Sequence, residues 1–240
     1  MKSLKFIGMA MVAILACANF AACNKDDSNK SVGEKKLVKI AYDDGLAFTF
    51  SYDNQGRAIE AREGEEDWHD WVHSFTWEGN TLKVTDDGRT RSIYTVDNGL
   101  VQKRYTPDGD SYHYYSYNSA GRLVRISGHY NSEFTWSGDK LISTVGVGDF
   151  DTTYTYGNVT CNKGYYPLFS EEMINMAHPE IFGMKTTQLP VGSTNIFRGP
   201  NSENNFSETY AYEFDAEGYI SKIITTKKDG TIYSCTLTWQ

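Results

Sequence analysis

The chain has few cysteines, few prolines and a deficit of basic residues. Its 240 residues include 4 Cys and 5 Pro, and 31 Asp and Glu residues outnumber 23 Lys and Arg residues, which gives a formal net charge of −8. Phosphate binding needs clustered Lys and Arg, so this acidic balance argues against nucleic acid as a partner. The net charge carries no information about the fold.

The chain also lacks the common short motifs of several enzyme classes. It has no Gly-x-Ser-x-Gly elbow, no phosphate-binding loop and no dinucleotide fingerprint. Its acidic clusters do not have the spacing of an EF-hand calcium loop. We therefore predict no catalytic residues, no metal and no other cofactor. These absences favour a non-enzymatic protein without deciding the question.

Long hydrophobic runs are missing except for one at the N-terminus. Lys2 and Lys5 precede an almost entirely apolar stretch over residues 6–20, and the small residues Ala21 and Ala22 follow it. This order is typical of a secretory signal peptide. The run is shorter than the ~20 residues that a membrane-spanning helix needs, so we predict a cleaved leader over residues 1–22.

Cys23 follows the small residues directly, and a polar stretch begins after it. This arrangement resembles the lipobox of bacterial lipoproteins, which implies that Cys23 is lipidated and that residues 23–36 form a flexible tether. Cys17 is a competing position. The segment Lys25-Asp26-Asp27 resembles the signal that sends Bacteroidetes lipoproteins to the cell surface. We expect a lipid-anchored outer-membrane protein facing the cell exterior, with the periplasmic face as the alternative.

Two cysteines, Cys161 and Cys235, remain in the body of the mature chain. In an oxidising compartment they could form a disulfide. The sequence does not show whether their Cα atoms come close enough to pair, so two buried free thiols are the alternative.

Aromatic residues are abundant, with 17 Tyr, 12 Phe and 5 Trp, and many of them recur in one pattern. An aromatic-x-aromatic triplet is followed by a short polar turn that usually contains Gly, and then by an alternating aliphatic run. Most intervals are roughly 20 residues, which indicates a repeat architecture. The triplets are residues 50–52, 75–77, 94–96 (with Val96 in the last place), 115–117, 134–136, 154–156 and 212–214.

Each copy of the repeat has the pattern of a β-hairpin. Alternation with a period of two predicts a strand with one buried face, and Asn, Asp and Gly in the interruptions favour hairpin turns. Because single hairpins are unstable alone, successive copies should pair into an antiparallel meander. The residues expected on the buried face are Phe50, Tyr52, Phe75, Trp77, Phe134, Trp136, Tyr154 and Tyr156, and those expected to face water are Ser51, Thr76, Thr135 and Thr155.

The turns carry a Tyr-Asp-x-x-Gly-Arg-Leu theme that resembles YD (RHS-type) repeats. It is present over residues 52–57 and, with Asn in place of Asp, over residues 117–123, while the copy at 214–219 lacks the Arg. Together with the lipobox, residues 38–240 resemble a Bacteroidetes lipoprotein family of unknown function described as having a porin-like fold. This resemblance implies a barrel and no activity.

We predict an all-β protein with a single β-domain over residues 37–240. An antiparallel β-hairpin meander would curl into a soluble barrel or a strongly curved sheet of about 12–14 strands, since six or seven hairpins are present. A lipid-spanning barrel needs an apolar outward face, whereas the outer positions here hold residues such as Glu60, Arg62 and Lys83. We therefore expect a barrel in water rather than a channel.

The repeat lapses over residues 159–208, an irregular segment that contains four of the five prolines. Residues 170–177 predict one short helix, with Ser170 as its N-cap and Pro179 ending it. We expect the segment to plug or cap the sheet. A lid over a binding cavity is the alternative.

Residues 63–73 are the best local candidate for a ligand-binding site. Trp68, Asp70 and Trp71 combine aromatic rings with a carboxylate, which suits carbohydrate. His69 and His73 would lie about 13 Å apart along a strand, too far for joint metal ligation. The alternative for the whole segment is core aromatics beside a solvated acidic turn.

The leading hypothesis is a non-enzymatic, lipid-anchored envelope domain that binds a glycan or a partner protein. One alternative is a structural envelope component without a ligand. Another is a hydrolase with a cavity under residues 159–208, which would need carboxylates, His or Cys converging in a cleft.

Overall fold

The computed structural model describes residues 34–65, 68–167, 173–200 and 204–240. The predicted leader, Cys23 and most of the predicted tether lie outside this part of the chain. Within the described ranges, no helix is both long and apolar enough to span a membrane.

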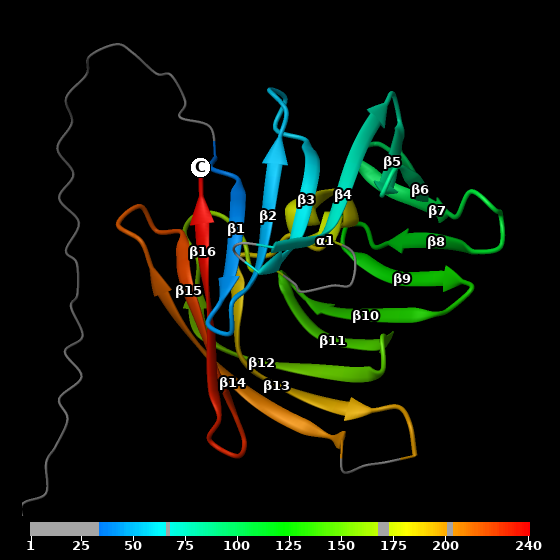
Figure 1. The fold of residues 1–240 in the computed structure, drawn as a ribbon. Helices are drawn as coiled ribbons and strands as arrows, with labels where there is room; N and C mark the ends of the chain where they lie inside the picture. Colours follow the sequence, from blue (N-terminus) through cyan, green and yellow to red (C-terminus); the bar gives the residue numbers. More distant parts are fainter. Residues whose placement is uncertain (1–33, 66–67, 168–172, 201–203) are drawn as a thin grey trace, which may run out of the picture. The chain divides into compact units, whose positions relative to one another are not determined.

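Sixteen β-strands form the described domain (Figure 1). Each has 6 to 11 residues and alternates between inward and outward side chains. Their bounds are β1 (Leu37–Tyr42), β2 (Leu46–Tyr52), β3 (Ala58–Glu65), β4 (Trp68–Glu78), β5 (Thr81–Asp86), β6 (Arg89–Asp97), β7 (Leu100–Tyr105), β8 (Tyr112–Tyr117), β9 (Leu123–Gly128), β10 (Ser132–Ser137), β11 (Lys140–Val147), β12 (Phe150–Thr160), β13 (Gln188–Phe197), β14 (Phe206–Phe214), β15 (Ile220–Lys227) and β16 (Ile232–Trp239).

The strands form one closed barrel. Each strand pairs antiparallel with its neighbours in sequence, and β1 pairs with β16 to close the sheet. The predicted meander is confirmed, but the predicted 12–14 strands are too few. β1 and β16 flank the repeat without carrying its turn, so a count of hairpins omits them. β13 begins at Gln188, inside the segment where the repeat lapses.

The turns at one end of the barrel explain the Asp-x-x-Gly theme. In the β2–β3 turn, Asp53 Oδ1 accepts hydrogen bonds at 2.9 Å from the backbone N–H groups two and four residues later. Gly56 takes a φ of 74° in the same turn, which a residue with a Cβ rarely adopts. Asn118 and Asp215 act in the same way in the β8–β9 and β14–β15 turns. The acceptor side chain therefore stabilises each of these turns.

Aromatic residues near these turns are linked to the neighbouring strand. Seven described Tyr or Trp side chains on even-numbered strands donate a hydrogen bond of 2.6–2.9 Å to a backbone carbonyl near the start of the preceding strand. The bond satisfies the polar atom of a ring that otherwise packs in the core. The pairs are Tyr52–Leu37, Trp77–Ala58, Tyr117–Val101, Trp136–Leu123, Tyr156–Leu141, Tyr212–Pro190 and Trp239–Ile220. We call these seven side chains the aromatic girdle.

The predicted alternation of faces is confirmed. Phe50, Phe75 and Phe134 are buried, and their Tyr and Trp partners pack half-buried at the girdle. The outer positions Ser51, Thr76, Thr135 and Thr155 are all exposed. In the last copy of the repeat Tyr212, rather than Phe214, takes the girdle position, and Phe214 is exposed.

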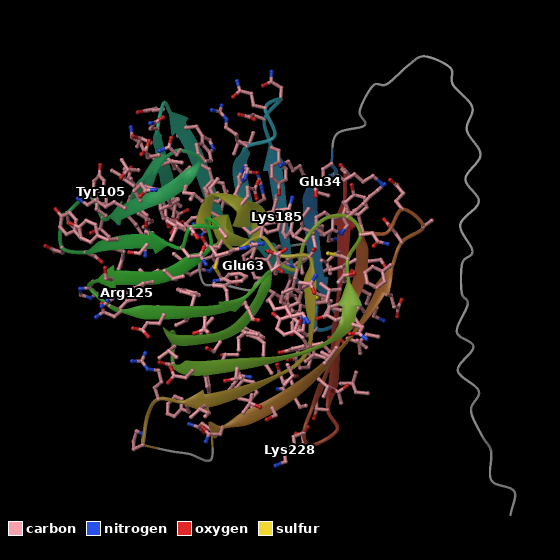
Figure 2. All side chains as sticks on the ribbon, turned by 180° about the vertical axis from the view of Figure 1, so that it is seen from behind. Glu34, Glu63, Tyr105, Arg125, Lys185 and Lys228 are labelled. Atoms are coloured by element: carbon pink, nitrogen blue, oxygen red, sulfur yellow. The ribbon has the colours of Figure 1, made fainter. Side chains whose placement is uncertain are left out.

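Residues 161–187, which we call the insertion, connect β12 to β13, and their described parts, 161–167 and 173–187, pack inside the barrel. They contain α1 (Met173–Ala177) and the 3-10 helix η1 (Pro179–Phe182), and both views place α1 within the ring of strands (Figures 1 and 2). The Phe182 ring lies 5.8 Å from the ring of Tyr94, and His178 Nε2 accepts a 2.8 Å hydrogen bond from the Ala58 N–H. The predicted short helix is therefore present as α1, although its predicted N-cap, Ser170, lies outside the described residues.

The two ends of the barrel differ. The terminal end holds Glu34, Gln240, the aromatic girdle and both ends of the insertion. The cavity end holds the β1–β2, β3–β4 and β15–β16 hairpins. Figure 2 shows Glu34 and Lys228, which follows β15, at opposite ends of the barrel.

Candidate binding site

Two cavities lie on the inner face of the barrel toward the cavity end. The first, which we call the mouth cavity, has a volume of about 280 Å³. The second, the inner cavity, has a volume of about 260 Å³ and reaches the insertion. The mouth cavity is lined by Asp44, Leu46, Glu63, Gly64, Glu65 and Trp71, and the inner cavity by Tyr42, Tyr166, Glu208, Tyr210, Ile223, Thr225, Tyr233 and Cys235.

The pairing of β2, β3 and β4 builds the mouth cavity. Leu46 lies opposite Glu65, and Glu63 lies opposite Trp71, so these side chains share the inner face. The β1–β2 turn adds Asp44, whose Oδ1 accepts a 3.1 Å hydrogen bond from the Leu46 N–H. Trp71 is 54% exposed although it points into the lumen, so its ring is accessible to a ligand.

The predicted binding residues are only partly placed. Trp71 lies in the mouth cavity, as a ligand-binding role requires. Trp68 and Asp70 belong to β4, but their side chains lie outside the part of the chain that is described, as does Cys23. Their predicted roles therefore stay predictions.

The inner cavity carries a chain of polar contacts on β12, β13, β14 and β16. Glu208 accepts hydrogen bonds from the hydroxyls of Tyr233 and Tyr210. The Tyr210 hydroxyl also lies 2.7 Å from that of Ser193. Asn195 then bonds to Ser193 at 3.0 Å and accepts a bond from Thr152 at 2.8 Å. These contacts hold the Glu208 carboxylate and two tyrosine rings in fixed positions.

Burial keeps the acidic hydroxyls and thiols of this region protonated. It raises the pKa of Tyr210 to about 12 and that of Cys235 to about 12. Burial, with Cys235, Tyr233, Asp44 and Glu63 as neighbours, also raises the pKa of Tyr42 well above its ordinary value. A thiol with such a pKa is a poor nucleophile.

Of the two alternatives for Cys161 and Cys235, the structure has the free thiols and not the disulfide. Cys161 and Cys235 are both free and buried in the structure. Cys161 lies at the start of the insertion and contacts the Thr187 carbonyl at 3.5 Å, whereas Cys235 faces the inner cavity from β16. Burial raises the pKa of Cys161 to about 11, so both residues behave as small apolar side chains.

A cavity under residues 159–208 was one alternative from the sequence, but the residues that line the inner cavity were not predicted. A signal was nevertheless present, because the alternation in Phe206-x-Glu208-x-Tyr210-x-Tyr212 puts a carboxylate on the same face as the girdle tyrosine. The partners Tyr42, Tyr166 and Tyr233 come from distant parts of the chain, and no local pattern connects them.

Both cavities are acidic. No Lys, Arg or His is among the described residues that line them, whereas Asp44, Glu63, Glu65 and Glu208 are. In the described ranges no group of three or more His, Cys, Asp or Glu side chains could hold a metal ion. The lumen thus offers carboxylates, hydroxyls and aromatic rings to a ligand.

The chain matches no protein-family model and no curated protein. Its fold is similar to that of a porin-like protein from Bacteroides uniformis ATCC 8492, with a TM-score of 0.63 and 16% identity over 87% of this chain and 99% of that chain. A porin-like protein from Bacteroides vulgatus ATCC 8482 aligns with a TM-score of 0.33 and 14% identity over 87% of this chain and 84% of that one. TcdB2-TccC3 aligns with a TM-score of 0.20 and 12% identity over 81% of this chain and 10% of that one. The first similarity shows a shared barrel fold, and the low TM-scores of the other two support no conclusion.

Proposed function

We propose that this protein is a non-enzymatic envelope lipoprotein, anchored through Cys23 and facing the cell exterior, whose barrel binds a glycan in the mouth cavity. The observation that carries the proposal is the Trp71 ring, 54% exposed on the inner face beside Asp44, Glu63 and Glu65. Aromatic rings stack on sugar faces and carboxylates accept hydrogen bonds from sugar hydroxyls, and this mixture of a ring with a few polar groups is typical of ligand pockets.

The outer face of the barrel supports an anchored protein rather than a pore. Outward positions such as Ser51, Thr76, Thr135 and Thr155 are exposed and polar, whereas a lipid-facing barrel carries an apolar band. The insertion also packs buried side chains such as Met176 and Phe182 inside the barrel. We propose that it acts as a plug at the terminal end, which leaves the cavity end for a ligand.

The glycan proposal can be tested by titrating the purified protein with a panel of polysaccharides. We expect at least one to bind and Trp71→Ala to weaken it about tenfold or more, because a stacked ring is lost. Tyr114→Ala, which removes an exposed ring from the outer face of β8, is the matched control and should leave affinity unchanged. No binding across the panel, or equal affinity for Trp71→Ala, would refute the proposal.

Lipid attachment needs its own experiment. In cells that are fed an alkyne fatty acid, the label should appear on the mature protein. Cys23→Ala should abolish the label, whereas Cys17→Ala should retain both the label and the mature N-terminus. Digestion of intact cells by an added protease would distinguish the exterior from the periplasmic face. Absence of label on the mature protein would contradict the anchor.

A partner protein is the second candidate ligand, and one outer surface favours it. Tyr105 and Tyr112 stack with ring centroids 6.3 Å apart, and Lys103 Nζ lies 4.4 Å from the Tyr112 centroid. Tyr114, which is 51% exposed, lies beside them. Tyrosine is enriched in protein interfaces, and three tyrosines gather on this outer surface. The double variant Tyr112→Ser/Tyr114→Ser should no longer capture the partner protein, whereas the Trp71→Ala variant should still capture it.

The hydrolase alternative has little support. Among the described residues that line the inner cavity, the one carboxylate is Glu208. Each of its two oxygens accepts a hydrogen bond from a tyrosine hydroxyl. The one thiol among the same described residues is Cys235, and burial raises its pKa to about 12, which keeps it protonated. Glycosidases need two carboxyl groups at a defined separation. The mouth cavity does collect three, so the binding assay should include a search for cleaved products.

A further inference from the structure

The inner cavity combines aromatic rings with a carboxylate. Tyr42, Tyr166, Tyr210 and Tyr233 line it together with Glu208. The face of an aromatic ring is electrically negative and attracts cations, more strongly when water is excluded. Four rings and one carboxylate around a single cavity therefore favour a positively charged group.

The Glu208 carboxylate is bound by hydroxyl groups rather than by a cation in the part of the chain that the structure describes. It accepts hydrogen bonds from Tyr233 and Tyr210, and no ion pair to it is found among the residues that the structure describes. Hydroxyl donors stabilise the ionised carboxylate without neutralising it. An incoming cation would complete its electrostatic environment.

The surroundings of the cavity are also negative. Asp44 and Glu63 act on Tyr42, and Asp43 acts on Cys235, each disfavouring a further negative charge. One cation lies close by: Lys227 is opposite Glu208 in the pairing of β14 with β15, and its Nζ is 5.3 Å from the Tyr233 ring centroid. The exposed side chain of Lys227 thus already places an ammonium group beside the Tyr233 ring of this cavity.

We propose that the inner cavity is a binding site for a compact organic cation, with its ammonium group against Glu208 and among the tyrosine rings. The volume of about 260 Å³ is below the ~300–1,000 Å³ of sites for drug-sized ligands. The cavity therefore takes a small molecule or the end of a larger one. An anion would be repelled by Glu208, and a neutral sugar would leave its charge uncompensated. The proposal concerns different residues from the mouth cavity and stands without it.

Amino sugars and choline-type compounds share this chemistry, so the experiment has an arm for each. Calorimetric titration of the purified full-length protein at constant ionic strength would use choline against its neutral isostere 3,3-dimethyl-1-butanol, and glucosamine against glucose. We expect at least one cation to bind about tenfold more tightly than its neutral partner. Choline binding would identify a quaternary ammonium ligand, and glucosamine binding an amino sugar. Equal affinity for cation and neutral partner in both arms would overturn the proposal.

Single substitutions test whether the cation binds in the inner cavity. Glu208→Gln keeps the shape of the side chain but removes its charge and replaces one acceptor oxygen by an NH2 donor, and we expect about a tenfold loss of affinity. Glu213→Gln removes a carboxylate from the outer face of the same strand and is the matched control. Trp71→Ala should also leave cation binding unchanged, which separates this proposal from the glycan site. Lys227→Gln should raise affinity, because a competing ammonium is removed.

Folding of each variant is checked by circular dichroism. A folded Glu208→Gln that binds the cation as well as the unaltered protein would overturn the proposal. Should that variant not fold, Tyr233→Leu decides, because it removes one ring and leaves the carboxylate. The proposal would also be overturned if the Tyr233→Leu variant and the Lys227→Gln variant both bound the cation with unchanged affinity.

Discussion

The two ends of the barrel use the same alternation of inward and outward side chains but differ in what the inward side chains meet. At the terminal end, girdle rings such as Trp136 and Trp239 bond to the neighbouring strand, and the insertion packs against them. At the cavity end, inward residues such as Trp71 and Glu208 meet cavities instead of packed chain. The comparison suggests that the terminal end stabilises the fold and the cavity end binds ligands, and the following changes test that division from the largest expected effect to the smallest.

The largest effect is expected from Phe182→Ala, at the centre of the insertion. Phe182 is 2% exposed and packs against Tyr94 and Tyr115 at ring distances of 5.8 and 6.0 Å. Deleting such a ring leaves a cavity and should lower the free energy of unfolding by about 3–5 kcal/mol, measured by urea unfolding. A loss below about 1 kcal/mol would mean that the insertion is not part of the folding core.

The next effect concerns pH and His113, an inward residue of β8 near the cavity end. It is 2% exposed, and neither ring nitrogen has a hydrogen-bond partner among the described residues. Burial, with Arg104 and His129 as charged neighbours, lowers the pKa of His113 to about 4. The unfolded chain, with an ordinary pKa near 6.5, binds the proton more readily, so stability present above about pH 6.5 is lost as the pH falls toward 4.

Unfolding in urea at pH 7 and pH 4.5 measures this loss, to which His113 should contribute about 2 kcal/mol. His113→Gln should reduce the difference between the two pH values. His129→Gln, at an exposed position, removes only one of the neighbours that lower the pKa of His113, and should reduce the difference by less. The same acid sensitivity in His113→Gln as in the unaltered protein would assign the effect to other groups.

A smaller effect is expected from Trp136→Phe in the girdle. The change keeps a ring for the Arg122 guanidinium, 5.1 Å away, but removes the 2.7 Å hydrogen bond from Nε1 to the Leu123 carbonyl. Leaving that carbonyl unsatisfied should cost about 1–2 kcal/mol of unfolding free energy. Thr135→Val, at the exposed neighbouring position, should stay within about 0.5 kcal/mol. Equal stability of the two variants would show that the girdle bonds add nothing.

The smallest effect on stability is expected at the mouth. Trp71→Ala removes a ring that is 54% exposed and should change the free energy of unfolding by no more than about 0.5 kcal/mol, while glycan affinity falls. Urea unfolding beside the titration checks both. A large loss of stability would make Trp71 part of the core, and the two ends would then no longer differ in role.

Much of the strand pattern could be predicted because it is local. The period of two put Phe50 and Phe75 inside and Ser51 and Thr76 outside, and the structure agrees. The strand count was too low because β1 and β16 pair across almost the whole chain, and no local turn marks that pairing. Trp71, which the sequence singled out, lies in the mouth cavity, and its binding role stays a prediction.

The sequence by itself determined which side chains face inward, because alternation along a strand depends only on the backbone. Tertiary structure alone decided whether an inward side chain becomes core or cavity lining. Phe50 and Tyr210 occupy equivalent inward positions, each two residues before a girdle tyrosine, yet Phe50 is buried in the core and Tyr210 lines the inner cavity. The physical reason is that the space in a barrel depends on the number of strands that close it and on how far the insertion reaches into it. Both are set by contacts between residues that are far apart in the chain.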